Sequence, residues 1–265
     1  TGLLLAGSAF TITTLSEAIG VVTGLPFGHY IYTGQLGPKA FGLVPFIIPV
    51  AWFMVLYPAY ETVRFLFRRL APQAWRESRW KAGLAQCLLA AAAMTAWDLS
   101  LDPRMVSAGH WVWRDGGPYF GIPLSNFAGW LLTSFIIYGV WRVFDRPVPA
   151  ASRGSSQPAT APLHAALPVL AYIVTWLGES IANVLFWSGP VVGLAVFAGM
   201  GLFAGPALVL LARQGFESSS NNQDDTPGRL RRAHARLTGK SQPAPADTLH
   251  KATQARNDRA DAIPG

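Results

Sequence analysis

The sequence predicts an all-α protein, a bundle of about six transmembrane helices followed by a disordered C-terminal tail. Of its 265 residues, 51% are hydrophobic and 13% are charged, whereas an ordinary soluble domain has about 25% charged residues. Its apolar stretches reach the length of about 20 residues that a helix needs to cross the hydrocarbon core of a bilayer. The six stretches lie at about 2–22, 42–67, 80–100, 122–144, 163–187 and 189–212.

The basic residues predict how these spans are oriented. Arg and Lys concentrate in the loops between spans two and three and between spans four and five, whereas the opposite loops hold only Lys39, Arg104 and Arg114. By the positive-inside rule the basic loops are cytoplasmic. We therefore expect a multi-pass protein of the cell membrane whose C-terminal tail is cytoplasmic. The net charge is +7, but the basic residues flank the spans and are not arranged as a nucleic-acid-binding face. No nucleic-acid partner is therefore expected.

The composition divides the chain into two parts. Residues 1–212 form the predicted transmembrane domain. Residues 213–265 are rich in Ser, Asn, Gln, Pro, Ala and mixed charges and have almost no aromatic residues. Such a segment cannot bury enough apolar surface to fold, so it is predicted to be a disordered cytoplasmic tail. Residues 145–162 are predicted to be a flexible linker for the same reason.

Four carboxylates lie within the predicted spans: Glu17, Glu61, Asp98 and Glu179. A carboxylate at the bilayer centre costs about 2.5–3.5 kcal/mol, so several of them suggest a function. Glu61 lies near the cytoplasmic end of its span, three residues before Arg64, and this spacing is typical of an ordinary helix-surface pair. The other three are predicted to lie toward the same, outer side of the membrane, where they are candidates for chemistry.

The first and fifth spans each carry a polar stripe. Thr175, Glu179 and Asn183 follow one another at intervals of four residues, as do Thr13 and Glu17, so each set lies on one helix face. Such stripes face the bundle interior because lipid offers them no partners. For the Thr and Asn residues, hydrogen bonding between helices is a sufficient explanation. For the two Glu residues a functional role is expected.

The third span ends with two carboxylates, Asp98 and Asp102, and then Pro103. Proline disfavours helix at the residue before it, so the helix is expected to break at Asp102. Asp98 would then be half-buried, and Asp102 would lie at the water interface, where it caps the next turn or pairs with Arg104 or Arg114. If the helix continues instead, both carboxylates lie on one face, one turn apart.

Two outer loops combine aromatic residues with glycine and proline, and no cofactor motif accompanies them. They cover residues 24–38 and 111–127, and this density of Gly and Pro indicates a fixed, irregular path. An interfacial aromatic belt explains any single Trp or Tyr there, but it does not explain two such loops beside buried acids. The five histidines form no HxxH or HxxxH pair, and GxGxxG, P-loop and CxxC motifs are absent. No metal ion or other cofactor is therefore expected.

Several ordered motifs carry a family resemblance. They are Glu17-x-x-Gly20, TGLPFGHYIYTGQLGP (23–38), VPFIIPVAWFMVLYP (44–58), AWDLSLDPRMVSAGHWVW (96–113) and YFGIPLSNFAGW (119–130). Together they resemble the membrane carotenoid biosynthesis family that includes bisanhydrobacterioruberin hydratase and gamma-carotene 1'-hydratase. The resemblance covers the membrane domain and not the tail.

This resemblance implies a hydro-lyase of the carotenoid 1,2-hydratase type. Such an enzyme adds water to a terminal carbon–carbon double bond of a linear C40 or C50 carotenoid within the lipid bilayer, and other carotenoid biosynthesis enzymes are its candidate partners. An unactivated alkene needs a strong proton donor, and a neutral buried carboxyl group can be one. The tertiary carbocation that follows can be stabilised by aromatic faces.

The hypothesis gives each candidate residue a role. Asp98 is the general acid, Glu17 or Glu179 holds the water or accepts its proton, and Asp102 completes the catalytic set. The residues expected to contact the substrate are Tyr30, Trp52, Trp111, Trp113 and Asn126. Three alternatives remain open at this stage: a carotenoid end-group cyclase or isomerase, a membrane transporter or lipid-binding protein that uses the acids as a proton relay, and a non-catalytic partner in a carotenoid enzyme complex.

Overall fold

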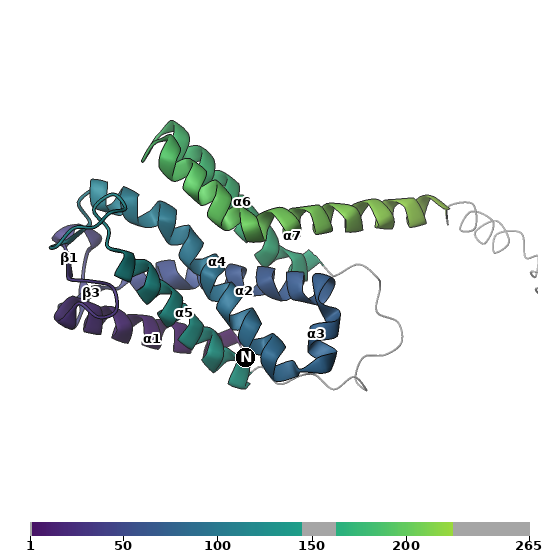
Figure 1. Ribbon diagram of the computed structural model, residues 1–265, viewed down its shortest axis with the longest axis horizontal. Helices are drawn as coiled ribbons and strands as arrows, with labels where there is room; N and C mark the ends of the chain where they lie inside the picture. Colours follow the sequence, from purple (N-terminus) through teal and green to yellow (C-terminus); the bar gives the residue numbers. More distant parts are fainter. Residues whose placement is uncertain (1, 145–162, 225–265) are drawn as a thin grey trace, which may run out of the picture. The chain divides into compact units, whose positions relative to one another are not determined.

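The computed structural model describes residues 2–144 and 163–224, and it confirms the all-α class (Figure 1). The predicted flexible linker (145–162) and residues 225–265 of the predicted tail lie outside the described residues. The chain divides into two units, Thr1–Arg213 and Gln214–Gly265. The helices are α1 (Gly2–Thr23), α2 (Ile47–Leu70), α3 (Pro72–Glu77), α4 (Arg79–Ser107), α5 (Leu124–Phe144), α6 (Leu163–Leu185) and α7 (Pro190–Asp224).

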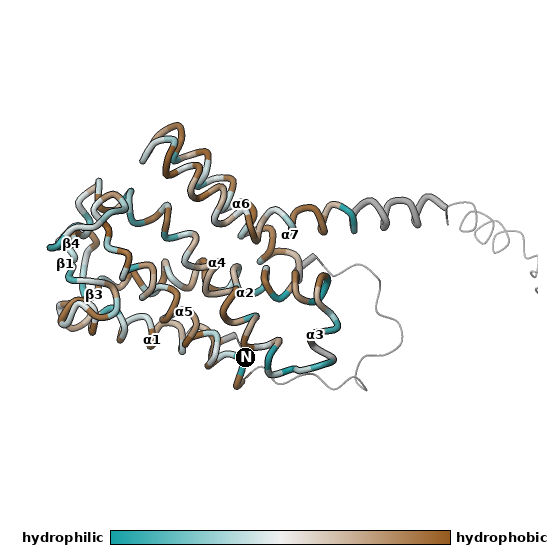
Figure 2. Tube along the Cα trace, viewed as in Figure 1, coloured by the Kyte–Doolittle hydropathy of each residue, from teal (hydrophilic) through white to brown (hydrophobic). Residues whose placement is uncertain are grey.

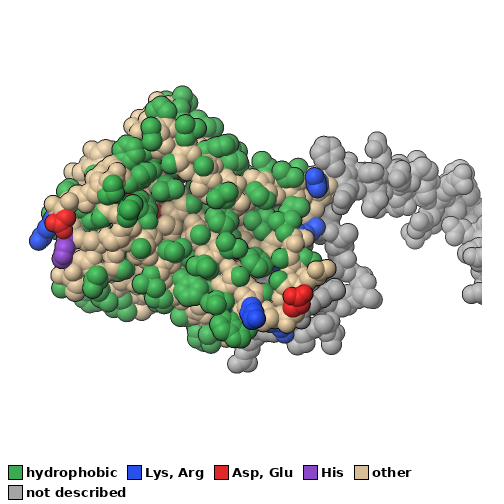
Figure 3. Space-filling model, in the orientation of Figure 1, with side chains coloured by type: hydrophobic (Ala, Val, Ile, Leu, Met, Phe, Trp, Pro, Cys, Tyr) green, Lys and Arg blue, Asp and Glu red, His purple; other side chains and the backbone are tan. Residues whose placement is uncertain are grey.

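Long helices occupy all six of the predicted apolar stretches. Five of them, α1, α4, α5, α6 and α7, are long and apolar enough to cross a membrane. The sixth, α2, has 24 residues but carries charged side chains in its second half, including Arg68 and Arg69 in its last turn. Figure 2 shows the apolar residues along the long helices and the hydrophilic ones near β1, β4 and α3. On the face in Figure 3, hydrophobic side chains cover the middle and charged ones lie toward the ends.

Helix α4 is the central helix of the bundle. It packs against α2, α5 and α6, and it is the most buried of the five candidate spans. Its middle turns carry Ala90, Ala91 and Ala93, all fully buried. Small side chains allow helices to approach closely in a membrane, where packing replaces the hydrophobic effect as the main attraction between helices. Polar residues further along α4 are therefore enclosed by other helices.

The helix break predicted at Asp102 is wrong, because α4 continues through Pro103 to Ser107. A proline inside a helix has no N–H for the carbonyl four residues earlier, which here is the carbonyl of Leu99. The hydroxyl of Tyr119, in the loop after α4, donates a hydrogen bond to this carbonyl oxygen at 2.9 Å. A tertiary contact thus replaces the missing backbone bond, and Asp98 and Asp102 come to lie on one helix face.

We expect Tyr119→Phe to lower the free energy of unfolding by about 1 kcal/mol, because it leaves the Leu99 carbonyl without its donor. In a Pro103→Ala background the loss should be smaller, since the new alanine can supply the backbone N–H itself. Denaturant unfolding of the purified single and double variants measures both effects as a double-mutant cycle. Equal losses in the two backgrounds would contradict this role of the tyrosine.

Two short antiparallel ribbons shape the loops after α1 and α4. Strand β1 (Tyr30–Tyr32), from the loop after α1, pairs with β4 (Trp111–Trp113), from the loop after α4. Strand β2 (Lys39–Ala40) pairs with β3 (Val44–Pro45). Alternate residues of a strand point to opposite faces, and Ile31 and Val112 are the exposed ones. The aromatic residues of both strands therefore point inward, over the ends of α1 and α4.

Candidate active site

A cavity of about 110 Å³ lies beneath the β1–β4 ribbon. Residues of α1, α2, α4 and α5 complete its wall, and most of them are aromatic or aliphatic. Three of its lining residues have a carboxyl or amide side chain: Glu17 from α1, Asp102 from α4 and Asn126 from α5. Three separate helices thus bring two carboxyl groups and an amide to one apolar cavity, which is the usual composition of a small-molecule site.

Aromatic rings form much of the cavity wall. Trp52 of α2 and Trp130 of α5 stack with ring centroids 3.9 Å apart and an angle of 15° between their planes. Across the ribbon, Tyr30 lies opposite Trp113 with ring centroids 5.7 Å apart. Aromatic faces carry negative potential, so a wall of this kind can stabilise a positive charge inside the cavity.

Two tyrosines of β1 hold Glu17. The side chain of Glu17 is 4% exposed, and its Oε2 accepts hydrogen bonds from the hydroxyls of Tyr32, at 2.7 Å, and Tyr30. Burial, followed by the nearby charge of Glu17, raises the pKa of Tyr30 and of Tyr32 well above the ordinary value of 10.0. Both phenols therefore stay protonated and act as donors, so Glu17 is placed as an acceptor.

Two aspartates, Asp98 and Asp102, accept hydrogen bonds from the side chain of Asn126. Asp102 is 2% exposed; its Oδ1 accepts from the indole Nε1 of Trp111 at 3.1 Å and its Oδ2 from Asn126 Nδ2 at 2.5 Å. The same Nδ2 donates to Oδ2 of Asp98 at 2.8 Å. Asp98 is fully buried and does not line the cavity. The expectation of a half-buried Asp98 and an interfacial Asp102 is thus wrong, because the unbroken helix carries both inside the bundle.

Two glycines allow this arrangement. A methyl group at Gly20, one turn after Glu17, would lie 2.7 Å from the ring of Phe27 and 3.0 Å from the hydroxyl of Tyr30. At Gly117 it would lie 2.1 Å from the backbone of Ile122. The first glycine gives Tyr30 room to reach Glu17, and the second lets the loop before α5 close tightly. Each is a point of close approach that only glycine permits.

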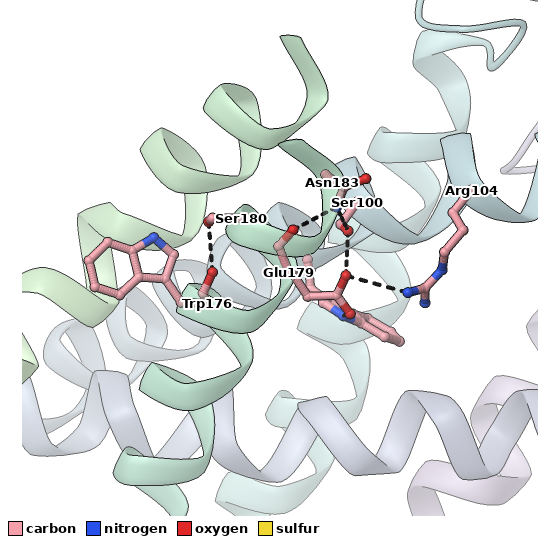
Figure 4. Close-up of polar contacts among 7 residues, drawn as sticks. Ser100, Arg104, Trp176, Glu179, Ser180 and Asn183 are labelled. Atoms are coloured by element: carbon pink, nitrogen blue, oxygen red, sulfur yellow. Dashed lines mark hydrogen bonds and ion pairs between the residues drawn. The ribbon is translucent and has the colours of Figure 1, made fainter. Parts of the chain in front are cut away.

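Glu179 lies in a different cluster, between α6 and α4 (Figure 4). Its Oε2 accepts from Ser100 Oγ at 2.6 Å and lies 3.6 Å from Nη1 of Arg104. Asn183 donates to Ser100 Oγ at 2.6 Å. Ser100 and Arg104 are one turn apart on α4, on a different face from Asp98 and Asp102. Glu179 does not line the cavity, and its contacts fasten α6 to α4.

Seven of the nine predicted site residues line the cavity. Asp98 lies behind the cavity wall, hydrogen-bonded to Asn126 and beside Asp102, and Glu179 lies apart. Three aromatic residues that line it were not predicted. Tyr32 could have been found from the alternation it shares with Tyr30, and Trp130 from its position one turn after Asn126, but Phe27 has no such signal. The seven are Glu17, Tyr30, Trp52, Asp102, Trp111, Trp113 and Asn126.

The fold and the cavity define a polytopic helical membrane protein with buried carboxyl groups in an aromatic site. Within residues 2–144 and 163–224, no group of three or more His, Cys, Asp or Glu side chains could hold a metal ion. The chain belongs to the carotenoid biosynthesis protein family, whose model matches residues 1–203. This confirms the resemblance found in the sequence motifs.

One curated relative is bisanhydrobacterioruberin hydratase of Haloarcula japonica. The two proteins are 32% identical over 202 residues, a match that covers 74% of this chain and 62% of the relative. The chain thus matches less than two thirds of the length of that protein. No solved structure matches the chain.

Proposed function

We propose that this protein is a carotenoid hydratase, which adds water to a terminal double bond of a linear carotenoid. The observation that carries the proposal is the cavity itself, in which two carboxyl groups from different helices, Glu17 and Asp102, share an aromatic wall. The similarity to a hydratase supports the reaction class. The apolar lining suits a polyene end group, and the helices around it suit a substrate that is dissolved in lipid.

In the proposed reaction Asp102 replaces Asp98 as the proton donor, because Asp102 is the aspartate that lines the cavity. Its proton goes to the less substituted carbon of the terminal double bond, and the π electrons form the new C–H bond. The tertiary carbocation left at the other carbon lies among Trp and Tyr rings, which stabilise it through cation–π attraction. Proton transfer by a positioned acid of this kind contributes about 10²–10⁴-fold to the rate.

Glu17 completes the reaction by accepting a proton from water. A lone pair of the water oxygen forms the C–O bond, and the proton that this oxygen loses passes to Glu17. Tyr30 and Tyr32 hold the carboxylate in place for this role. One proton leaves Asp102 and one arrives at Glu17, so the site is restored once a proton passes back between two groups of the same cavity. The net change is the addition of one water molecule.

The distribution of basic residues supports the location of this site. We propose that the protein lies in the cell membrane with its cavity near the outer face and its C-terminal tail in the cytoplasm, because the basic segment around α3 lies at the opposite end of the helices from β1 and β4. A linear carotenoid that crosses the bilayer presents its end group near an interface, at the depth of the cavity.

Expression in a lycopene-producing host tests the function. We expect a new pigment whose mass exceeds that of lycopene by one water for each end that reacts. Mass spectrometry of the extracted pigments measures this change, with the empty vector as the control. A new pigment of unchanged mass would indicate a cyclase or an isomerase, and an unchanged pigment profile from folded protein would contradict an enzymatic role toward this substrate.

A further inference from the structure

Behind the cavity, Asp98 and Asp102 share a single donor. The amide nitrogen of Asn126 carries two hydrogens, and it donates to Oδ2 of Asp102 and to Oδ2 of Asp98 at 2.5 and 2.8 Å. Both hydrogens are therefore used, and the two carboxyl oxygens lie on either side of one nitrogen. Oδ1 of Asp98 is fully buried and has no hydrogen-bond partner among the described residues. The geometry is that of a carboxyl pair, with one member facing the cavity and one enclosed behind it.

The described residues around this pair offer it no compensating positive charge. Arg104, the basic residue nearest to it in sequence, is paired with Glu179, and Lys39 donates its Nζ proton to the backbone oxygen of Tyr32. Glu17 on α1 adds a further carboxyl group. The other titratable groups near the pair are Tyr30, Tyr32 and Tyr119.

These tyrosines are neutral donors and leave the balance of charge unchanged. Burial, followed by the charges of Asp98 and Asp102, raises the pKa of Tyr119 to about 12, and the pKa values of Tyr30 and Tyr32 are raised as well. Ionising both aspartates would therefore place two like charges on one amide in a buried site. Carboxyl pairs in this situation keep at least one proton.

We propose that Asp98 and Asp102, held side by side by the amide of Asn126, form a carboxyl pair that shares one proton directly once the other has been given up. In this pair Asp102 is the catalytic donor and Asp98 is a positioning residue. At rest each carboxyl group carries a proton. When Asp102 gives its proton to the substrate, the proton of Asp98 remains in the pair and stabilises the carboxylate left on Asp102, together with the N–H groups of Asn126 and Trp111. The catalytic part of this inference rests on the proposed hydratase function, whereas the proton sharing does not.

Infrared spectroscopy of the purified protein in lipid tests the sharing directly. The carbonyl stretch of protonated carboxyl groups is followed as the pH is raised. In the wild type we expect the pair to lose its protons in two steps, because the second loss creates adjacent charges. Asp98→Asn and Asp102→Asn should each leave one step, at a lower pH than the second step of the wild type. Both substitutions preserve side-chain size, and either variant alone suffices for the comparison.

Glu61→Gln is the matched control, since it removes a carboxylate that is paired with Arg64 on α2, and it should leave both steps in place. A single step in the wild type, at the same pH as in the folded variants, would overturn the proton sharing. If the two steps are present but the wild type hydrates no carotenoid, the pair stands and the proposed function fails.

Turnover supplies the second readout. Asp98→Asn is expected to lower kcat about tenfold, the effect of weakening one hydrogen bond to a charged group. KM should not change, because Asp98 does not line the cavity. A rise in KM with unchanged kcat would contradict a role that acts through Asp102.

Discussion

Replacing Asp102 by Asn is expected to lower the hydration rate at least about 100-fold, because the general acid of such a reaction contributes about 10²–10⁴-fold. The asparagine has nearly the same size, and its single amide oxygen can still accept a hydrogen bond from one of the two donors, Trp111 or Asn126, that hold the native carboxyl group. It has no acidic proton to give to the alkene. The rate of formation of the hydrated carotenoid by the purified variant, reconstituted in lipid, measures the loss.

Deuterium labelling shows which step this substitution stops. In heavy water, the Asp102→Asn variant should return its substrate without deuterium, since protonation of the double bond no longer occurs. Glu61→Gln removes a carboxylate that does not line the cavity and is paired with Arg64. It serves as the control and should hydrate at the wild-type rate. Hydration by folded Asp102→Asn at more than a tenth of the wild-type rate would assign the proton to another group.

Replacing Glu17 by Gln is expected to have the second largest effect, a loss of about 100-fold in hydrated product. Glutamine can still accept hydrogen bonds from Tyr30 and Tyr32, but it cannot take a proton from water. Asp102 remains intact, so the carbocation still forms and returns to the alkene by losing a proton. In heavy water the recovered substrate should therefore contain deuterium, in contrast to the Asp102→Asn variant.

The two tyrosines supply a graded comparison for Glu17. Tyr30→Phe and Tyr32→Phe each remove one of the hydroxyl groups that hold the carboxylate, and each should lower hydration less than Glu17→Gln does. If Glu17→Gln leaves the recovered substrate free of deuterium, as Asp102→Asn does, Glu17 acts before the carbocation and not after it. Normal hydration by folded Glu17→Gln would remove it from the mechanism.

The helices and the acidic residues were predictable from the sequence, but the environment of each acid was not. Apolar stretches of the length of a bilayer located all six long helices, and the cost of burying charge singled out Glu17, Asp98 and Glu179. The predicted position of Asp102 was wrong, because the helix does not break before Pro103. The hydroxyl of Tyr119, sixteen residues further along the chain than Pro103, donates a hydrogen bond to the carbonyl of Leu99 that the proline leaves free.

Which acids share a site depends on how each helix is rotated against its neighbours. Glu17 and Glu179 belong to similar polar stripes in the sequence, but their partners differ. Glu17 accepts hydrogen bonds from two tyrosines of β1, whereas Glu179 accepts one from Ser100 and is paired with Arg104, both on α4. The ribbon that closes the cavity joins two loops about eighty residues apart, and its register follows from no local pattern. The aromatic density of these loops indicated a site, and the pairing of β1 with β4 could be known only from the structure.

The source of the oxygen tests the central claim most directly. The purified protein, reconstituted in lipid with lycopene, is incubated in water enriched in oxygen-18 under ordinary oxygen gas, and the pigments are analysed by mass spectrometry. A hydratase that works as proposed incorporates one oxygen-18 atom for each new tertiary alcohol. Product oxygen that comes from the gas, or a product without added oxygen, would contradict the addition of water in this cavity.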